Sequence, residues 1–336
     1  MKRLVVDTPN ILFRVYSANK KNHVGDNETD AGLAMHMCFR TILSFYKKLK
    51  PDQIAFAFEG PFNWRKDYTR SDVCVSGRLY KGNRVKDDSN QLFFEMIDQF
   101  KFFVKNHTTA ICLQHDKVEG DDMIAGFVQH FAESEDDEIE ILSGDKDFTQ
   151  LLRQKNVKII NPDKNGKPRE HDDPEYFIFE KCLRGDSGDN VMSAYPRVRS
   201  TKIEKAFVDE FARANLMNET WEIKDPESGE ITKTFRVGDL FEENKLLMDL
   251  TAQPEEIKQI IKETVANSFN ERGSYSYFHF MRFLGKYKLD AIADEAMKYD
   301  DMFSLNDKRA QAKKEMQEAS SVSSPKIKRA GTIVQF

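Results

Sequence analysis

Acidic side chains recur in this sequence just after short runs of strand-forming residues. Asp7 follows LVV directly, Glu59 follows IAFAF, and the acids of VEGDD come a few residues after AICL. Further acids stand in SGDKDF, after IEIL, and in LRGDSGDNV. The nine carboxylates are Asp7, Glu59, Glu119, Asp121, Asp122, Asp145, Asp147, Asp186 and Asp189. Ligands of open parallel sheets bind beyond the carboxyl ends of the strands, so we expect these acids to converge on one rim.

So many carboxylates cannot share a site unpaired, because like charges disfavour the ionisation of their neighbours and burial adds to that cost. Hard divalent cations resolve the conflict. Mg²⁺, for which Mn²⁺ can substitute, prefers oxygen ligands and keeps several waters. Two such ions, about 4 Å apart, activate a water and stabilise the leaving oxygen in phosphodiester hydrolysis. The pattern therefore predicts a two-metal site that needs no histidine or serine nucleophile.

The segment EGDDMIA supports this interpretation. Its apolar pattern starts at Met123, so the acids occupy the first turn of a helix, where exposed backbone N–H groups favour negative charge. Taken singly, each acid is more simply explained as a helix cap or a turn residue; Asp7, close to Pro9, is an example. Their joint occurrence at consecutive strand ends favours a functional site.

The acids are carried by an alternation of strand and helix patterns. Apolar β-type runs occupy 4–6, 54–58, 110–113, 139–142 and 157–160. Between them, the segments 33–49 and 122–132 have apolar residues at helical spacing and should cover the sheet faces. The predicted fold class is α/β, with a mostly parallel central sheet flanked by helices.

The pattern changes near residue 190. We predict an α/β catalytic domain over 1–190 and a helical, DNA-binding subdomain over 191–306. A polar insertion at 218–238, with Pro226 and Gly229 among alternating β-formers, predicts a hairpin. The charged and then Ser-rich segment 307–336 is predicted to be a flexible tail.

Composition narrows the class of protein. With 336 residues, 40% of them hydrophobic, the chain can bury a substantial core. It opens with KRLVV and then Asp7, without an apolar stretch suited to secretion or membrane insertion, so we expect a cytoplasmic monomer. The four cysteines, at 38, 74, 112 and 182, are too far apart in sequence for a zinc knuckle and do not form a disulfide framework.

The net charge of −5 is unusual for a protein that binds nucleic acid. Basic residues nevertheless gather in one stretch, made up of Arg65, Lys66, Arg70, Arg78, Lys81, Arg84 and Lys86. An arbitrary basic run is more simply a solvated loop. In this sequence the basic stretch follows Glu59, the second of the nine acids.

VEGDDMIA, SGDKDFTQL and LRGDSGDNV occur in this order, and with them the sequence resembles the 5′-nuclease superfamily of flap endonucleases and bacterial polymerase 5′-nuclease domains over roughly residues 1–290. In WRKDY, YKGNR and NKLLMDLTAQP it is most similar to the T-even bacteriophage ribonucleases H. The resemblance implies a 5′-nuclease/PIN-like fold with a helical arch at about 67–105. It also implies 5′-3′ exonuclease and flap endonuclease activity.

The resemblance also assigns roles to residues. The first metal cluster would be Asp7, Glu59, Glu119, Asp121 and Asp122, and the second Asp145, Asp147, Asp186 and Asp189. The catalytic residues would be Asp145 together with the basic residues Arg65, Lys81 and Arg84, which would stabilise charge on the scissile phosphate. Contacts to nucleic acid would come from Arg70, Arg78, Tyr80, Lys86, Arg197, Arg199, Lys202 and Lys205. Tyr80 is a candidate for stacking on an end base, and the alternative is an ordinary packed tyrosine.

Two departures from the family pattern stand out. Position 59 is Glu where the family usually has Asp, which lengthens that ligand by one methylene. After GDSGDN the chain reads VMSAYPRVRSTKIEKAF, without the glycines of the family's helix-hairpin-helix turn.

The expected substrates are branched or flapped DNA and RNA–DNA duplex, with RNA primer removal during phage replication in a host bacterium as the role. The C-terminal GTIVQF resembles peptides that bind a sliding clamp, and single-strand-binding protein is a second expected partner. One alternative is a PIN-type ribonuclease, a class that lacks the arch and the GDSGDN extension. The other is a non-catalytic branched-DNA-binding protein, although all nine acidic positions keep a carboxylate.

Overall fold

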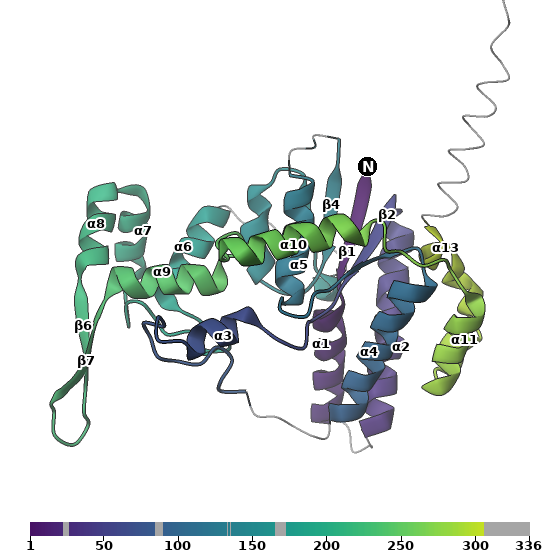
Figure 1. Ribbon diagram of the computed structural model, residues 1–336, viewed down its shortest axis with the longest axis horizontal. Coiled ribbons are helices and arrows are strands. Elements are labelled where there is room, and N and C mark those ends of the chain that lie inside the picture. The colour runs from purple at the N-terminus through teal and green to yellow at the C-terminus, as the bar shows by residue number, and fades with distance from the viewer. Residues whose placement is uncertain (23–26, 85–89, 133, 135, 165–172, 306–336) are drawn as a thin grey trace, which may run out of the picture.

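The computed structural model describes residues 1–22, 27–84, 90–132, 134, 136–164 and 173–305 (Figure 1). Its centre is one five-stranded sheet in the order β3-β2-β1-β4-β5, and every neighbouring pair is parallel. The strands are β1 (Lys2–Asp7), β2 (Gln53–Ala57), β3 (Ile111–Leu113), β4 (Glu138–Leu142) and β5 (Val157–Ile160). The predicted α/β fold with a parallel sheet is confirmed.

Alternate residues of the strands enter two different cores. Leu4 and Val6 of β1 face the first core, whereas Val5 between them faces the second. A strand buried on both faces places successive side chains on opposite sides in this way. The first core is covered by α1 (Thr8–Asn22), α2 (Asn27–Leu49), α4 (Gln91–His107), α11 (Tyr277–Lys286), α12 (Asp290–Ala293), η4 (Ala296–Lys298) and α13 (Asp300–Phe303).

The second core lies under α5 (Gly120–His130), η2 (Asp147–Arg153) and α10 (Glu255–Ser268). The two long helices cross closely at Gly126, where a Cβ would stand 2.1 Å from Cγ2 of Ile261. Helix α3 (Trp64–Arg70) borders this core: Trp64 is buried in it, and Tyr68 packs against both the second and the third core.

A third core forms at one end of the molecule (Figure 1). Its elements are α6 (Pro174–Arg184), α7 (Ser200–Val208), α8 (Glu210–Asn218), β6 (Thr220–Lys224), β7 (Ile231–Arg236) and α9 (Val237–Met248). The short helix η3 (Pro162–Lys164) follows β5. β6 and β7 form an antiparallel hairpin inside the insertion where one was predicted. Residues 191–306 were expected to form one helical subdomain. Their described part instead packs in three places: α7–α9 and the hairpin in the third core, α10 in the second, and α11–α13 in the first.

The segment expected as an arch is divided as well. Its later part is α4, an amphipathic helix with Phe93, Met96 and Phe100 buried in the first core. This part is a sheet-covering helix, because its apolar stripe is matched by that of α2 and α11. Among the described residues 71–84, those in contact with the acids are Tyr80, Lys81 and Arg84. No helix in the described ranges is long and apolar enough to cross a membrane.

Candidate active site

The parallel sheet brings three strand ends to one edge. Asp7 is the last residue of β1; it is in register with Ala57 of β2, and Val6 before it is in register with Leu142 of β4. Glu59 and Asp145 therefore leave the sheet within three residues of the same level. The first turn of α5 adds Asp121. We call these four residues, Asp7, Glu59, Asp121 and Asp145, the primary acidic group.

Asp7 is the most buried member, with 3% of its surface exposed. Its two carboxylate oxygens accept hydrogen bonds from the backbone N–H of Asn10 at 3.2 Å and from the Ser143 hydroxyl at 2.6 Å. Burial raises the pKa of Asp7 to about 7, and the carboxylates of Asp145 and Glu59 add to the rise against the two hydrogen bonds.

Glu59 sits at the solvent-facing rim and accepts the Gly120 N–H at 3.1 Å. Desolvation raises the pKa of Glu59 to about 7, supported by the charge of Glu119 and opposed by that of Lys81. The charge of Glu59 in turn helps to raise the pKa values of Asp7 and Asp121, so the longer side chain at position 59 still acts on the other acids.

Asp121 is subject to the same crowding. Burial, followed by the charges of Asp7, Asp145 and Glu59, raises the pKa of Asp121 well above its usual range, and Lys81 is the cation that opposes this. The opposing charge that acts on both Glu59 and Asp121 is thus that of Lys81.

The donor set fits a hard divalent cation, because oxygen ligands with unbalanced negative charge are what such an ion prefers. Within the described part of the chain, no three acidic, histidine or cysteine side chains stand close enough to enclose an ion by themselves. Magnesium is typically held by only one or two carboxylates and keeps several waters, so an open arrangement of this kind suits it.

A second acidic pair is bridged by a lysine. Nζ of Lys181, on α6, lies 2.5 Å from Oδ1 of Asp147 and 3.1 Å from Oδ2 of Asp186. Asp186 also accepts the Gly188 N–H at 2.8 Å. Burial favours the protonated acid, but Lys181 and these hydrogen bonds outweigh it and lower the pKa of Asp186. For Asp147, burial dominates and raises the pKa despite Lys181.

Glu119 and Asp189 are connected by the segment 80–84. The Tyr80 hydroxyl donates to Oε2 of Glu119 at 3.1 Å and to Oδ2 of Asp189 at 3.0 Å. Nζ of Lys81 lies 2.5 Å from Oε1 of Glu119, and Nη2 of Arg84 lies 2.7 Å from Oδ1 of Asp189. Lys81 and Arg84, two of the three basic residues expected to be catalytic, therefore stand at the acids.

Tyr80 needs a correction. Stacking on an end base requires an exposed ring face, yet Tyr80 is only 6% exposed and packs in the third core. Its polar end acts instead as a buried hydrogen-bond donor. Burial, reinforced by the Glu119 carboxylate, raises its pKa well above the usual value and keeps the phenol protonated.

Asp122 faces away from the primary acidic group, into a buried ion pair. Nη1 and Nη2 of Arg65 lie 2.5 and 2.7 Å from its two oxygens. Trp64 Nε1 and Gln253 Nε2 also donate to it, at 3.3 and 2.9 Å. Burial alone would raise the pKa of Asp122, but the Arg65 charge and these bonds lower it. All four donors compete with a metal ion for this carboxylate.

Arg65 is likewise enclosed, with 2% of its surface exposed. Beyond Asp122 it contacts Glu119 at 3.1 Å and donates from Nε to the Leu247 carbonyl at 2.7 Å. Burial would lower its pKa, but the surrounding acids raise it further above the usual value. Arg65 therefore holds Glu119 and Asp122 in place, and its charge affects the site through these two carboxylates.

The residues expected to contact nucleic acid differ in availability. Arg70, Arg78, Arg197, Arg199 and Lys205 are exposed. Nζ of Lys202 instead lies 2.6 Å from Oε1 of Glu219. Lys86 lies outside the described residues. Five exposed cations thus remain: Arg70 at the end of α3, Arg78 in the loop after it, Arg197 and Arg199 just before α7, and Lys205 in the last turn of α7.

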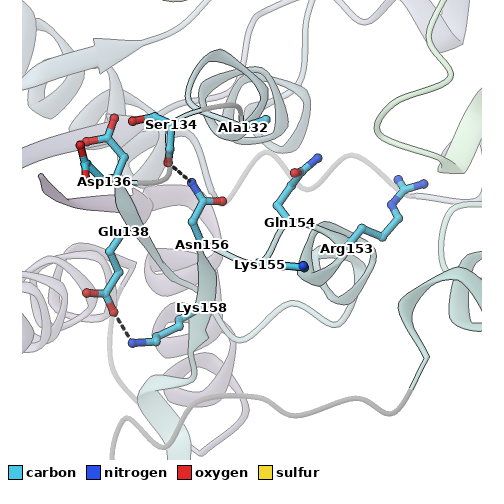
Figure 2. Close-up of a pocket in the computed structure, with 10 residues that line it drawn as sticks. Ala132, Ser134, Asp136, Glu138, Arg153, Gln154, Lys155, Asn156 and Lys158 are labelled. Atoms are coloured by element: carbon cyan, nitrogen blue, oxygen red, sulfur yellow. Dashed lines mark hydrogen bonds and ion pairs between the residues drawn. The ribbon is translucent and has the colours of Figure 1, made fainter.

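A depression elsewhere on the surface lies at the opposite edge of the sheet. Figure 2 shows residues of its lining at the amino ends of β4 and β5. The depression has a volume of about 940 Å³. Glu138 there pairs with Lys158, and Asn156 donates to the Ser134 carbonyl at 3.5 Å. Asp137 is likewise paired with Arg3, and the depression lies at the amino ends of the strands, away from the primary acidic group, so we do not take it as the site of the chemistry.

Three positions of the site are missing from the sequence interpretation. Lys181 bridges two acids, Ser143 links Asp7 to the backbone of Asp145, and Gln253 completes the surroundings of Asp122. Lys181 could have been suspected, since it stands a few residues before the GDSGDN acids in the sequence. Gln253 is distant in sequence and carries no such sign.

Comparison with known proteins supports the same chemistry. Residues 2–181 match the family model of the 5′-3′ exonuclease, N-terminal resolvase-like domain. Ribonuclease H of Enterobacteria phage T4 is 28% identical over 237 residues, which is 64% of this chain and 70% of that protein. A 5′-3′ exonuclease of Mycoplasmopsis pulmonis (strain UAB CTIP) is 28% identical over 200 residues, 56% of this chain and 61% of its own length.

Solved structures share the fold. The bacteriophage T5 D15 protein, co-crystallised with metal ions, superposes with a TM-score of 0.55 at 18% identity, over 80% of this chain and 100% of its own. A T5 D15 flap endonuclease pseudo-enzyme-product complex with DNA and metal ions gives a TM-score of 0.53 at 17% identity, with the same coverage.

Proposed function

Because the chain belongs to the 5′-3′ exonuclease family and is a nuclease, we propose that it hydrolyses phosphodiesters near 5′ ends with the help of magnesium ions. The observation that carries this proposal is the primary acidic group. Burial and mutual repulsion raise the pKa values of Asp7, Glu59 and Asp121, and Lys81 is the cation that opposes the rise for Glu59 and Asp121. A divalent cation removes that imbalance.

The primary acidic group would hold one ion. Asp147, Asp186 and Asp189 would hold a second, once the ammonium group of Lys181 has moved away from Asp147 and Asp186. When bound, such ions supply the charge that activates a water and stabilises the leaving oxygen. Mn²⁺, with similar oxygen preferences, would substitute.

The basic residues of the chain would bind the scissile phosphate. Lys81 and Arg84 are paired with Glu119 and Asp189, so their charged ends already stand at the site. A phosphate group can replace these carboxylates, because its hydrogen bonds to Lys81 and Arg84 also join a cation to an anion. The same N–H groups would then stabilise the negative charge that develops on the phosphoryl oxygens. Arg84 can move readily because 59% of its side chain is exposed.

Branched or flapped DNA and RNA–DNA duplex are the proposed substrates, and RNA primer removal during phage replication is the proposed role. Support comes from relatives: the T4 protein is named ribonuclease H, and a T5 structure is titled as a flap endonuclease complex with DNA and metal ions. The proposed clamp-binding and single-strand-binding-protein contacts would use GTIVQF, which lies outside the described residues. We propose that the chain acts as a monomer.

The first test is a 5′-labelled flap duplex with an RNA–DNA junction, incubated with magnesium or with EDTA. We expect magnesium-dependent release of short 5′ products, and none from the Asp145→Asn variant. Digestion of RNA but not of the DNA flap would indicate a PIN-type ribonuclease. Intact substrate that is shifted by bound protein would indicate a non-catalytic binder.

A further inference from the structure

Helix α9 contacts three parts of the site: Arg65 of α3, the loop that carries Asp186 and Asp189, and the loop that precedes Lys81. The Leu247 carbonyl accepts Nε of Arg65 at 2.7 Å. Asn244 donates to the carbonyls of Cys182 and Met192, both at 2.8 Å, and so holds the two ends of the loop that carries Asp186 and Asp189. A third residue of α9, Glu243, contacts the loop that precedes Lys81 and Arg84.

Glu243 is a buried carboxylate, 3% exposed, whose bonds go to the loop at Val75 and Ser76 and to Tyr68 of α3. It accepts the backbone N–H of Ser76 at 3.1 Å and that of Val75 at a shorter distance. It also accepts the Tyr68 hydroxyl, and burial together with the Glu243 charge raises the pKa of Tyr68 to about 12. Burying a carboxylate is costly unless hydrogen bonds compensate it, so this group is committed to the loop.

The loop ends in the catalytic segment. From Ser76 the chain reaches Tyr80 and Lys81 in five residues, and Tyr80 N–H donates to the Thr69 hydroxyl at 3.0 Å. Lys81 has a left-handed backbone, with φ of 54°, and its N–H donates to the Asp189 carbonyl at 2.8 Å. A non-glycine residue keeps that conformation only where its surroundings enforce it.

The hairpin β6–β7 adds a second anchor to the same loop. Nζ of Lys233 donates to the Val75 carbonyl at 2.9 Å, so Val75 is held through both its N–H and its carbonyl. This contact lies at the surface, whereas Glu243 is buried. The loop is therefore fixed chiefly from α9.

We propose that Glu243 is a positioning residue of the nuclease: by holding Val75 and Ser76 it sets the place of Lys81 against the acids. This inference rests on the proposed function, in which Lys81 binds the scissile phosphate. Glu243 itself touches none of the acids. Its effect on the reaction passes through the loop.

The kinetic test compares Glu243→Gln with Glu242→Gln, the exposed acid next to it on α9. On the flap duplex with magnesium, we expect Glu243→Gln to lower kcat at least about tenfold with KM changed less than about threefold, and Glu242→Gln to match wild type. The decisive comparison repeats both substitutions in a Lys81→Ala background under single-turnover conditions. In that background Glu243→Gln should lower the rate less than about twofold, because Lys81, through which Glu243 acts on the substrate, is absent.

An equal loss in both backgrounds would show that Glu243 serves only general stability, and the proposal would be wrong. Lys233→Met provides a second variant that leaves the buried carboxylate in place. It should lower kcat by a smaller factor, again only when Lys81 is present.

Amide hydrogen exchange separates this inference from the proposed function, because it needs no cleavage. We expect faster exchange across residues 75–81 in Glu243→Gln than in wild type or Glu242→Gln, with α9 itself unchanged. Unchanged exchange in that segment would overturn the anchoring role even in an active enzyme. Absence of cleavage by the wild-type protein in magnesium or manganese would overturn the proposed function, while exchange would still decide whether Glu243 holds the loop.

Discussion

The guanidinium of Arg65 closes on both carboxylate oxygens of Asp122, at 2.5 and 2.7 Å, in a place that solvent does not reach. A parallel pair of this kind is the strongest geometry available to an arginine and a carboxylate. It joins α3 to α5 directly behind the acids. The pair therefore sets the distance between the helix that carries Asp121 and the segment that carries the basic residues.

Removing one member of this pair should destabilise the protein. Asp122→Asn leaves a buried guanidinium with an incomplete partner, and we expect a loss of about 3 kcal/mol in the free energy of unfolding, measured by urea denaturation. Arg70→Ala is the matched control, since Arg70 pairs with Asp67 at the surface, and it should cost less than about 0.5 kcal/mol. A loss below about 1 kcal/mol for Asp122→Asn would mean that Arg65 is held by its other contacts.

Asp145→Asn should abolish cleavage without loss of fold or of nucleic-acid binding. The substitution removes the charge of a proposed metal ligand in the primary acidic group, and we expect less than about 1% of wild-type turnover on the flap duplex. Asp294→Asn, at an exposed position of the α12 end, is the control and should be fully active. Wild-type rates from Asp145→Asn would remove the central claim about the site.

Stability should fall as pH rises when metal is absent. Asp7 has a pKa of about 7 in the folded protein against an ordinary value of 3.8, so the folded state binds more protons than the unfolded state between these values. With EDTA we therefore expect a lower Tm at about pH 8 than at about pH 5, and a smaller decline in Asp7→Asn. Magnesium should raise Tm most at the higher pH, where the acids are ionised. A rise of Tm with pH in EDTA would contradict the assigned direction.

Lys181 should compete with a divalent cation for Asp147 and Asp186. In Lys181→Met the two acids lose their bridging ammonium, and we expect calorimetric titration with Mn²⁺, without nucleic acid, to show binding roughly tenfold tighter or an additional site. Lys146→Met removes the same charge from an exposed lysine between Asp145 and Asp147, and should change affinity less than about threefold. Equal effects of the two substitutions would show that net charge, and not the bridge, controls metal binding.

Sequence reasoning reached the strand ends but not the side-chain partners. The apolar runs are each bounded by acids, and parallel strands bring such boundaries together whatever the details of packing, so the carboxylates of Asp7 and Asp145 could be placed. Asp121 and Asp122 are adjacent, and the sequence treats them alike. Helical geometry separates them by about 100°, which turns one toward the acids and the other toward Arg65.

Long-range contacts explain the remaining differences. Nothing near Tyr80 indicates that its hydroxyl meets Glu119 and Asp189, because those residues are 39 and 109 positions away. The later part of the expected arch became a core helix because α11, almost 180 residues on, supplies apolar partners for it. Glu243 resembles any other acid of a charged helix until the loop at Val75 is placed beside it.

The position of α9 has a consequence for the timing of activity during synthesis. Ribosomes release the chain from its N-terminus, so every member of the primary acidic group emerges long before Leu247 and Gln253, which secure Arg65 and Asp122. A growing chain thus carries the acids but not the framework that fixes them. We expect nuclease activity to begin only after α9 has been synthesised and has packed against the site. Nearby nucleic acid would then be protected from an incompletely synthesised chain.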